Sequence, residues 1–397
     1  MDQTRIASLL ATYRDGLLHD TLPFWLRHAV DREHGGFLFC LDRDGRVVDT
    51  DKGLWQHGRF TWLLSTLDHE LRGTPHWRSE WLDTARHGVE FLRRHGFDRD
   101  GRMFFQVTRD GRPLRKRRYV FSEAFAAIAF AAYARASGEQ RAADEARAVF
   151  RTMVEYATTP GLIPPKVDPE TRPSVGLAMP MITLVTAQVL RDTIGDAFAA
   201  AQVDRAIAEL RGFVKPELDV VLEQMAPDGG VIDHFDGRTL NPGHALEAGW
   251  FVLDEAWRRG GDAELTALGT SIVDCMWRRG WDEQYGGLLY FVDLHGGPVQ
   301  EYWHDMKFWW PHNEAILATL FAWRATRDER YAQWHGMVHD WAYRHFPDPE
   351  HGEWFGYLHR DGRRSVTLKG NLWKGPFHLP RMQYRCWQLL EGVLAGG

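Results

Sequence analysis

Residues 124–136 read AFAAIAFAAYARA, an almost unbroken run of alanine with aromatic and branched apolar side chains. A helix at a protein surface is apolar along one face only, whereas this run is apolar on nearly every side. The segment therefore predicts a helix that other helices enclose. Apolar residues at three- and four-residue spacing predict further helices, at residues 245–256, 314–325 and 384–394.

A turn signal recurs between the helical stretches. Residues 285–290 read YGGLLY, and similar Gly- and Asp-rich turns elsewhere are usually followed by short aromatic or β-branched stretches. Successive turns are 57 to 68 residues apart, which leaves room for two helices and a short hairpin-like loop in each interval. The six turns are centred on Gly35, Gly101, Gly161, Gly229, Gly286 and Gly352.

These intervals predict one all-α catalytic domain, residues 1–397, in which six helix pairs form an (α/α)6 barrel. A helix pair of this size cannot bury its own apolar face and must stack on its neighbours. Closing six pairs into a double ring removes the open ends that an α-solenoid, the alternative architecture, would have to cap. Because successive inner helices then point the same way, residues at their N-terminal ends are expected to meet at one mouth.

Charge and cysteine content exclude several functional classes. The chain has 48 Lys and Arg residues against 54 Asp and Glu residues, a net charge of −6, without the basic surface that nucleic acid or an anionic membrane requires. Three cysteines without metal-type spacing indicate neither a disulfide framework nor a zinc site. Residues 1–5 do not begin a secretory signal, and the longest uncharged run, residues 173–190, contains two prolines. These features predict a cytoplasmic protein.

Two short stretches near the C-terminus concentrate the groups that carry out chemistry. Residues 309–314 read WWPHNE and residues 374–381 read KGPFHLPR, and the earlier segment 242–250, PGHALEAGW, has the same ingredients. Indole rings cover the apolar C–H face of a sugar ring, while imidazoles and carboxylates transfer protons or bind hydroxyls. The three stretches together predict a sugar-binding pocket with proton-transfer groups.

The chain resembles the N-acylglucosamine 2-epimerase family, also called renin-binding proteins, over essentially its whole length. The resemblance implies the (α/α)6 fold and 2-epimerisation between N-acetylglucosamine and N-acetylmannosamine. In sister branches it implies epimerisation of cellobiose or of glucose and mannose, or isomerisation of mannose. The matching segments are residues 55–59, 119–125, 178–181, 241–250, 306–315, 352–357 and 374–381.

The chemistry of 2-epimerisation assigns roles to three of these residues. Inverting C2 of an aldose requires removal of a weakly acidic C–H and return of a proton from the opposite face. Histidine suits both steps because its pKa lies near working pH. By resemblance, His244 and His378 are the catalytic pair. Arg59 is then expected to stabilise the negative charge that develops on O1 of an enediolate.

Further pocket residues are expected by position or resemblance. Glu247 lies one helical turn beyond His244 and is predicted to orient that imidazole or to bind hydroxyls. Glu314 resembles the family's pocket carboxylate, and His312 is predicted to cap a helix or bind a hydroxyl. Trp309 and Trp310, with Trp373 and Phe377, are candidates for a sugar platform. Three cations, interpreted as solvated or mouth-lining charges, receive no role: Lys307, Lys374 and Arg381.

No cofactor is required by this mechanism, and no metal is predicted, because isolated His and Glu pairs are weak ligand signals. Some members of the family respond to ATP, but residues 370–375 do not match a phosphate-binding loop, so an ATP effector is weakly supported. The predicted partner is a monosaccharide substrate, and the resemblance also suggests a homodimer.

Three alternative functions remain open from the sequence. One is a free-hexose or disaccharide 2-epimerase or an aldose–ketose isomerase, because the pocket for an acetamido group cannot be identified. Another is an inverting glycoside hydrolase, which also occurs on (α/α)6 barrels and would use carboxylates such as Asp233, Asp236 and Glu314. The last is a non-catalytic binding protein.

Overall fold

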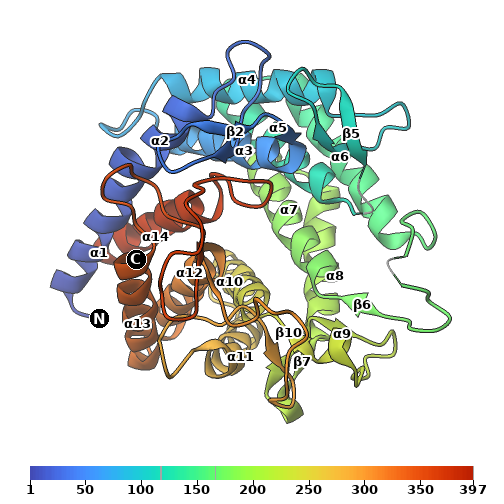
Figure 1. Cartoon of the computed structure of the whole chain (residues 1–397), viewed down its shortest axis with the longest axis vertical. Coiled ribbons are helices and arrows are strands. Elements are labelled where there is room, and N and C mark those ends of the chain that lie inside the picture. The colour runs from blue at the N-terminus through green and yellow to red at the C-terminus, as the bar shows by residue number, and fades with distance from the viewer. Residues whose placement is uncertain (117–118, 166, 397) are drawn as a thin grey trace.

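The computed structural model describes residues 1–116, 119–165 and 167–396 and shows helix pairs arranged in a ring (Figure 1). The chain forms the predicted (α/α)6 barrel. Each inner helix packs against an outer partner and against neighbouring inner helices. The inner helices are α3 (Leu54–Leu71), α5 (Phe121–Ser137), α7 (Ala178–Ile194), α10 (Pro242–Arg258), α12 (Trp309–Thr326) and α14 (His378–Leu394). Their outer partners are α4 (Glu80–His95), α6 (Gln140–Thr158), α8 (Ala197–Arg211), α11 (Ala263–Gly280), α13 (Glu329–His345) and, beside α14, α1 (Gln3–Asp15).

Burial separates the two rings as the hydrophobic pattern predicts. Residues 122–134 of α5 and 309–323 of α12 are all buried, because inner helices face either other helices or the enclosed central cavity. The outer helix α4 instead buries one stripe, which includes Trp81, Ala85 and Val89. Among the described residues, every helix is too short or too polar to cross a lipid bilayer. Cys40, Cys275 and Cys386 are free thiols.

All six predicted turn glycines have a backbone that disfavours other residues. Gly35, Gly101, Gly161, Gly229, Gly286 and Gly352 have φ angles between 70° and 86°, the left-handed region that only glycine adopts without strain. The turns lie in the connections between each outer helix and the next inner helix. The predicted periodicity is therefore a repeat of backbone geometry.

Small antiparallel sheets arrange the loops at the mouth of the ring. The strand pairs are β1–β2, β6–β9, β7–β8, β10–β11 and β12–β13, and β3–β4–β5 form a three-stranded sheet. In β12–β13, Lys307 pairs with Leu358 and Phe308 with Tyr357. The strands are β1 (Cys40–Leu41), β2 (Val47–Asp49), β3 (Lys52–Gly53), β4 (Phe104–Val107), β5 (Pro113–Lys116), β6 (Val175–Gly176), β7 (Val214–Lys215), β8 (Val220–Val221), β9 (Gln224–Met225), β10 (Thr239–Leu240), β11 (Val292–Asp293), β12 (Lys307–Phe308) and β13 (Tyr357–Leu358). Shorter helices complete the chain: a π-helical turn (Gly16–Thr21), α2 (Leu22–His28), a 3-10 turn (Pro216–Leu218) and α9 (Phe235–Arg238).

Three of the turns are held by buried ion pairs of the same design. In the turn after α11, Lys307 Nζ lies 2.8 Å from Asp282 Oδ2, and Arg360 Nε lies 2.9 Å from the same oxygen. Burial lowers the pKa of Lys307 to about 8, with Asp282 opposing the shift. The interpretation of Lys307 as a solvated charge is thus wrong. The other two sets are Asp31 with Lys52 and Arg109, and Asp348 with Lys369 and Arg43.

The two ends of the chain meet and complete the ring. Helix α1 packs against α14. The side-chain amide of Gln56, on α3, donates a hydrogen bond of 2.7 Å to the carbonyl of Asn371, and the ring of Trp62 packs edge-on against Phe377 just before α14. The first and last inner helices are therefore joined by the loop that leads into α14, which places both of them at the same cavity.

Candidate active site

A cavity of about 1130 Å³ occupies the centre of the barrel. Residues at the N-terminal ends of the inner helices and in the adjacent loops surround its mouth. The wall is rich in aromatic side chains, as expected for a sugar pocket. It includes Trp309, Trp310, Trp373 and Phe377, the proposed platform, together with Trp55, Trp62, Phe125, Trp250, Trp303 and Tyr357.

Two predicted catalytic residues begin inner helices. His244 is the third residue of α10, which starts at Pro242, and the side chain of the N-cap Asn241 accepts a hydrogen bond of 3.2 Å from the His244 backbone N–H. His378 is the first residue of α14. Because both helices run the same way, these starts bring residues 134 positions apart to one end of the barrel.

Both imidazoles line the cavity and pack against the same indole. The ring centroid of Trp310 lies 5.0 Å from that of His244 and 5.6 Å from that of His378. Trp310 comes from α12, the inner helix between α10 and α14 in the ring. Trp310 therefore lies between the two histidines on the α12 side of the cavity. On the side away from α12, the space between the two imidazoles is open to the cavity.

A carboxylate holds the ring of His244. Nδ1 of His244 lies 2.9 Å from Oε1 of Glu223, a residue between β8 and β9. Burial lowers the pKa of His244, but Glu223, with Glu247 and Glu314 further away, outweighs burial and raises the pKa overall. Since Nδ1 is committed to Glu223, Nε2 is the atom that can exchange a proton with a ligand. The environment favours the imidazolium form.

The environment of His378 has the opposite effect. Nδ1 of His378 lies 2.6 Å from Oε1 of Glu314. Burial lowers the pKa of His378 well below its ordinary value; Glu247 opposes the shift, and the cations Arg381 and Arg59 add to it. These surroundings favour the neutral ring, and when Nδ1–H donates to the carboxylate, Nε2 carries the free lone pair. His378 is arranged as a base where His244 is arranged as an acid.

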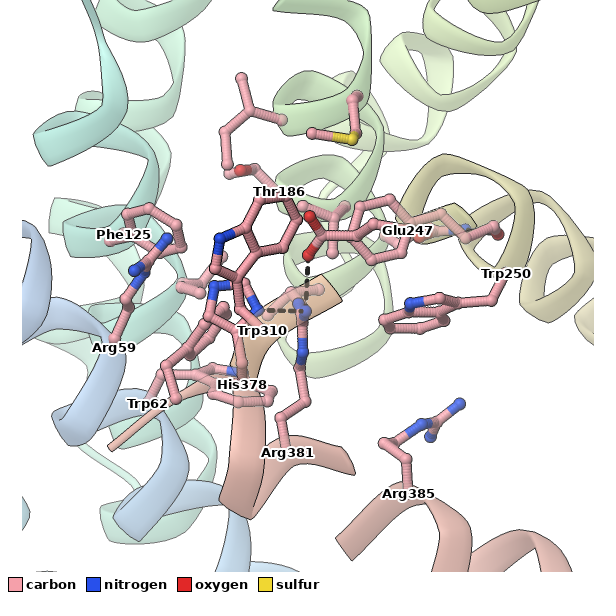
Figure 2. Close-up of a pocket in the computed structure, with 18 of the residues that line it drawn as sticks. Arg59, Trp62, Phe125, Thr186, Glu247, Trp250, Trp310, His378, Arg381 and Arg385 are labelled. Carbon is pink, nitrogen blue, oxygen red and sulfur yellow. Dashed lines mark hydrogen bonds and ion pairs between the residues drawn. The ribbon is translucent and has the colours of Figure 1, made fainter. Parts of the chain in front are cut away.

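Arg381 connects the carboxylates around His378. One of its guanidinium nitrogens lies 2.5 Å from Oε1 of Glu247 and 2.6 Å from Oε1 of Glu314. Figure 2 shows Arg381 reaching from α14 toward Glu247, with His378 and Trp310 beside it. Arg381 was interpreted as a solvated or mouth-lining charge without a role, but it is buried in the site. Its spacing of three residues from His378, on one helical face, is the signal that could have found it.

Glu314 lies outside the cavity lining, and Glu247 does not contact the imidazole that it was predicted to orient or to bind hydroxyls beside. Glu314 is completely buried behind the cavity wall, and its other oxygen, Oε2, accepts a hydrogen bond of 2.7 Å from the indole N–H of Trp250. Its carboxylate contacts Trp250, His378 and Arg381, so it positions His378 and Arg381. Glu247 lines the cavity but binds Arg381, and Glu223 takes the place beside His244 that Glu247 was expected to fill.

Arg59 lies on the cavity wall from α3 with aromatic rings around its guanidinium. The carbon at the centre of that group is 4.2 Å from the ring centroids of Trp55 and Phe125 and 4.5 Å from that of Phe377. The faces of these rings attract the guanidinium through cation–π contacts and hold it at the cavity wall. The arrangement suits a group that must attract a developing negative charge. Figure 2 shows Arg59 against Phe125.

His312 is placed outside the cavity wall, contrary to its predicted pocket role. Its Nε2 accepts a hydrogen bond of 2.9 Å from the backbone N–H of Leu288, and its Nδ1 lies 2.6 Å from the carbonyl of Phe308. Burial lowers the pKa of His312 to about 3. His57 makes the equivalent bonds to Phe37 and Gly53 in the first repeat. His312 and His57 therefore have the same structural role: each holds a glycine-containing turn against the start of an inner helix.

The geometry disfavours two other arrangements, a metal site and a pair of hydrolytic carboxylates. Glu247, Glu314 and His378 each offer one ligand atom within 4.8 Å of the others, which is compact enough for a metal ion. The guanidinium of Arg381 already bridges the two carboxylates, however, so a cation would have to displace it. The hydrolase candidates Asp233 and Asp236 have side chains 74% and 54% exposed and do not line the cavity.

Comparison with known proteins identifies the family. Residues 35–378 match the sequence model described as N-acylglucosamine 2-epimerase (GlcNAc 2-epimerase). The chain belongs to this family. It is 37% identical to the N-acylglucosamine 2-epimerase of Bos taurus, with 95% of this chain and 90% of that protein aligned, and 36% identical to that of Mus musculus, with 95% and 91% aligned.

The epimerase family consists of isomerases, and the fold agrees with its solved structures. The cellobiose 2-epimerase of Bacillus thermoamylovorans B4167 superimposes with a TM-score of 0.83 over 98% of this chain and 100% of that chain, at 21% identity. The (α/α)6 barrel is thus shared where most of the sequence has diverged. The predictions of an (α/α)6 barrel and of an enzyme of the epimerase type are confirmed.

Proposed function

We propose that this chain interconverts N-acetylglucosamine and N-acetylmannosamine by removing and returning the proton at C2. The observation that carries the proposal is the pair of imidazoles on one cavity whose surroundings move their pKa values in opposite directions. A site with one neutral and one protonated histidine has both the base and the acid that a C2 inversion needs. The relatives that share 36–37% identity, both N-acylglucosamine 2-epimerases, support this substrate pair.

In the proposed mechanism, Nε2 of His378 takes the C2 proton of the open-chain sugar. The C–H electron pair forms a C1–C2 double bond, and the carbonyl electrons move to O1, which gives an enolate (an enediolate for a 2-hydroxy sugar). Arg59 stabilises the negative charge on O1. His244 then returns a proton to C2 from the opposite face. The opposite epimer reacts by the same steps with the roles of the histidines exchanged.

Carboxylates position both rings in this scheme. Glu314 holds the tautomer of His378, and Glu223 favours the protonated form of His244. Glu247 is held by Arg381 at the cavity wall, where its second oxygen can accept a hydrogen bond from a sugar hydroxyl. Trp309 and Trp310 provide the aromatic surface for the sugar C–H face. His312 contributes only to the fold.

The proton transfers balance without metal, nucleotide or redox cofactor, and we assign none; an ATP effector has no support in the site. Residues 1–397 are proposed to act as one catalytic domain, in a reducing compartment such as the cytoplasm that suits three free thiols. A homodimer is the proposed assembly.

Product analysis tests the function. The protein is incubated separately with N-acetylmannosamine, mannose and cellobiose, and the products are identified by NMR. N-acetylglucosamine formed from N-acetylmannosamine, at a kcat/KM above the values for mannose and cellobiose, is the expected result. Fructose from mannose as the main product would instead identify an aldose–ketose isomerase, and hydrolysis of cellobiose would identify a glycosidase. His244→Asn and His378→Asn variants that keep full turnover would contradict the two-histidine mechanism.

A further inference from the structure

The wall of the cavity opposite the charged residues is apolar. The charged and imidazole side chains that line the cavity near its mouth come from α3, α10 and α14, whereas α7 contributes side chains without charge there. Ala178, Met181, Ile182 and Val185 all line the cavity, at three- and four-residue spacing along one face of α7. We call Met181, Ile182 and Val185 the α7 wall. Thr186, labelled in Figure 2, lines the cavity just beyond it.

The α7 wall lies at the same depth as the proposed catalytic groups. Met181 and Ile182 are the fourth and fifth residues of α7, while Glu247 is the sixth residue of α10 and Arg381 the fourth of α14. Gln188, the eleventh residue of α7, donates a hydrogen bond of 3.2 Å to the carbonyl of Phe251, the tenth residue of α10, so similar positions on these parallel helices lie within about one turn in height, roughly 5 Å. These side chains therefore form one layer around the cavity.

The order of the inner helices sets where each substituent of C2 points. C2 lies between His244 on α10 and His378 on α14, and Trp310 fills the space between these rings on the α12 side. The groups on C2 must then extend toward the opposite half of the ring. Arg59, on α3, takes the side next to α14 and attracts O1. The remaining directions lead to α5, whose Phe125 ring is covered by the guanidinium of Arg59, and to α7, which is the neighbour of α10.

We infer that the α7 wall is the binding surface for the acyl group carried by the C2 nitrogen, and that it selects 2-acylamino sugars over free hexoses. The inference rests on the proposed function. An acyl methyl group buried against Met181, Ile182 and Val185 removes apolar surface from water. A free hexose places a hydroxyl against the same surface, where it loses its hydrogen bonds to water without a replacement.

A series of acyl sugars tests the wall. The kcat/KM values of N-acetyl-, N-propanoyl- and N-butanoylmannosamine and of mannose are measured for the unmodified protein, Met181→Ala and Val185→Thr. Met181→Ala is expected to lower the value for the N-acetyl sugar by about tenfold or more, the size that a lost apolar contact has in a specificity pocket. The same variant is expected to favour N-butanoylmannosamine, whose longer chain fills the vacated space. Val185→Thr, which keeps the side-chain shape, is expected to lower the preference for N-acetylmannosamine over mannose.

Val189→Ala is the matched control, because Val189 lines the cavity on the same face of α7 but about one turn deeper than Val185. For Val189→Ala, the ratios of kcat/KM between the sugars are expected to equal those of the unmodified protein. The ratio of the kcat/KM values of two sugars, measured on one preparation, does not depend on the fraction of folded protein. A destabilised variant therefore remains informative. An unmodified protein that turns over no acylamino sugar overturns the proposed function and this inference together. If the unmodified protein turns over acylamino sugars, and Met181→Ala and Val185→Thr have the same kcat/KM ratios between sugars as that protein, this inference alone is overturned.

Discussion

Nδ1 of His378 lies 2.6 Å from Oε1 of Glu314, and the carboxylate of Glu314 also receives hydrogen bonds from Arg381 and Trp250. Arginine and the tryptophan indole can only donate, so Glu314 accepts from both. The same carboxylate is then the natural acceptor for Nδ1–H of His378. This contact directs the basic Nε2 atom toward the cavity.

Glu314→Gln tests that positioning role. The amide can present an N–H to Nδ1 and stabilise the wrong tautomer of His378, so kcat is expected to fall by roughly 10²–10⁴-fold, the range seen when a buried carboxylate behind a catalytic histidine is replaced by its amide or removed. KM is expected to change little, since Glu314 lies behind the wall. Steady-state kinetics with N-acetylmannosamine measure both. Glu70→Gln, at a cavity-lining residue paired with Arg135 at the C-terminal end of α3, is the control. Equal kcat values for the two variants would contradict the role.

The pH dependence of kcat/KM follows from the two histidine pKa values. For the epimer that His378 deprotonates, the active form has neutral His378 and protonated His244; the opposite epimer needs the same single proton on the pair, carried by His378. His378, with its lowered pKa, stays neutral until the pH falls below 6.5, and His244, with its raised pKa, stays protonated until the pH rises above 6.5. A bell-shaped profile that spans this value is expected. Glu223→Gln removes the anion beside His244 and should move the alkaline limb to lower pH. A shift of the acid limb alone would contradict the assignment.

Arg381 is expected to contribute to stability as well as to the site. Arg381→Ala leaves the buried carboxylates of Glu247 and Glu314 without their shared cation, and loss of one partner from a buried ion pair costs about 3–5 kcal/mol. Urea unfolding gives the change in the free energy of unfolding. Arg86→Ala removes an exposed pair with Asp83, worth about 0–1 kcal/mol, and serves as the control. Similar losses for the two variants would show that the buried cluster is not stabilised by Arg381.

His312 is expected to behave as a structural residue. His312→Asn leaves the buried N–H of Leu288 or the carbonyl of Phe308 without a good partner, at a cost of roughly 1–3 kcal/mol. Thermal unfolding should show the loss, and His57→Asn, its counterpart in the first repeat, should show a similar one. The kcat per folded molecule should stay unchanged in both. A loss of kcat at unchanged stability in His312→Asn would return this residue to the pocket.

The sequence predicts the fold well because the features that determine it are local. A glycine in the left-handed region and an all-round apolar helix can each be recognised within about fifteen residues, and their repetition gives the ring. The start of α10 could also be placed closely, because Pro242 marks it, whereas the helix expected at residues 384–394 begins six residues earlier, at His378. His244 and His378 were assigned by resemblance to the family.

The rest of the site depends on contacts between distant segments. Glu223 comes from a loop between two short strands, and nothing in its neighbourhood indicates that it pairs with His244. Glu247 has the helical spacing to orient His244, yet Arg381 from α14 holds it instead. His312 shares the Pro-containing helix start that marks His244, but a turn from the preceding repeat packs on it. Local pattern cannot distinguish these outcomes, because the partner decides each of them.

Deuterium incorporation at C2 tests the central claim most directly. The protein is incubated with N-acetylmannosamine in deuterium oxide, and both epimers are examined by NMR. The two-histidine account predicts deuterium at C2 of the N-acetylglucosamine that forms. His244→Asn and His378→Asn are both expected to lose inversion. The variant that keeps the base for N-acetylmannosamine is expected still to exchange the C2 proton of that sugar with solvent. N-acetylglucosamine that forms with hydrogen retained at C2, or inversion that persists in both variants, would contradict it.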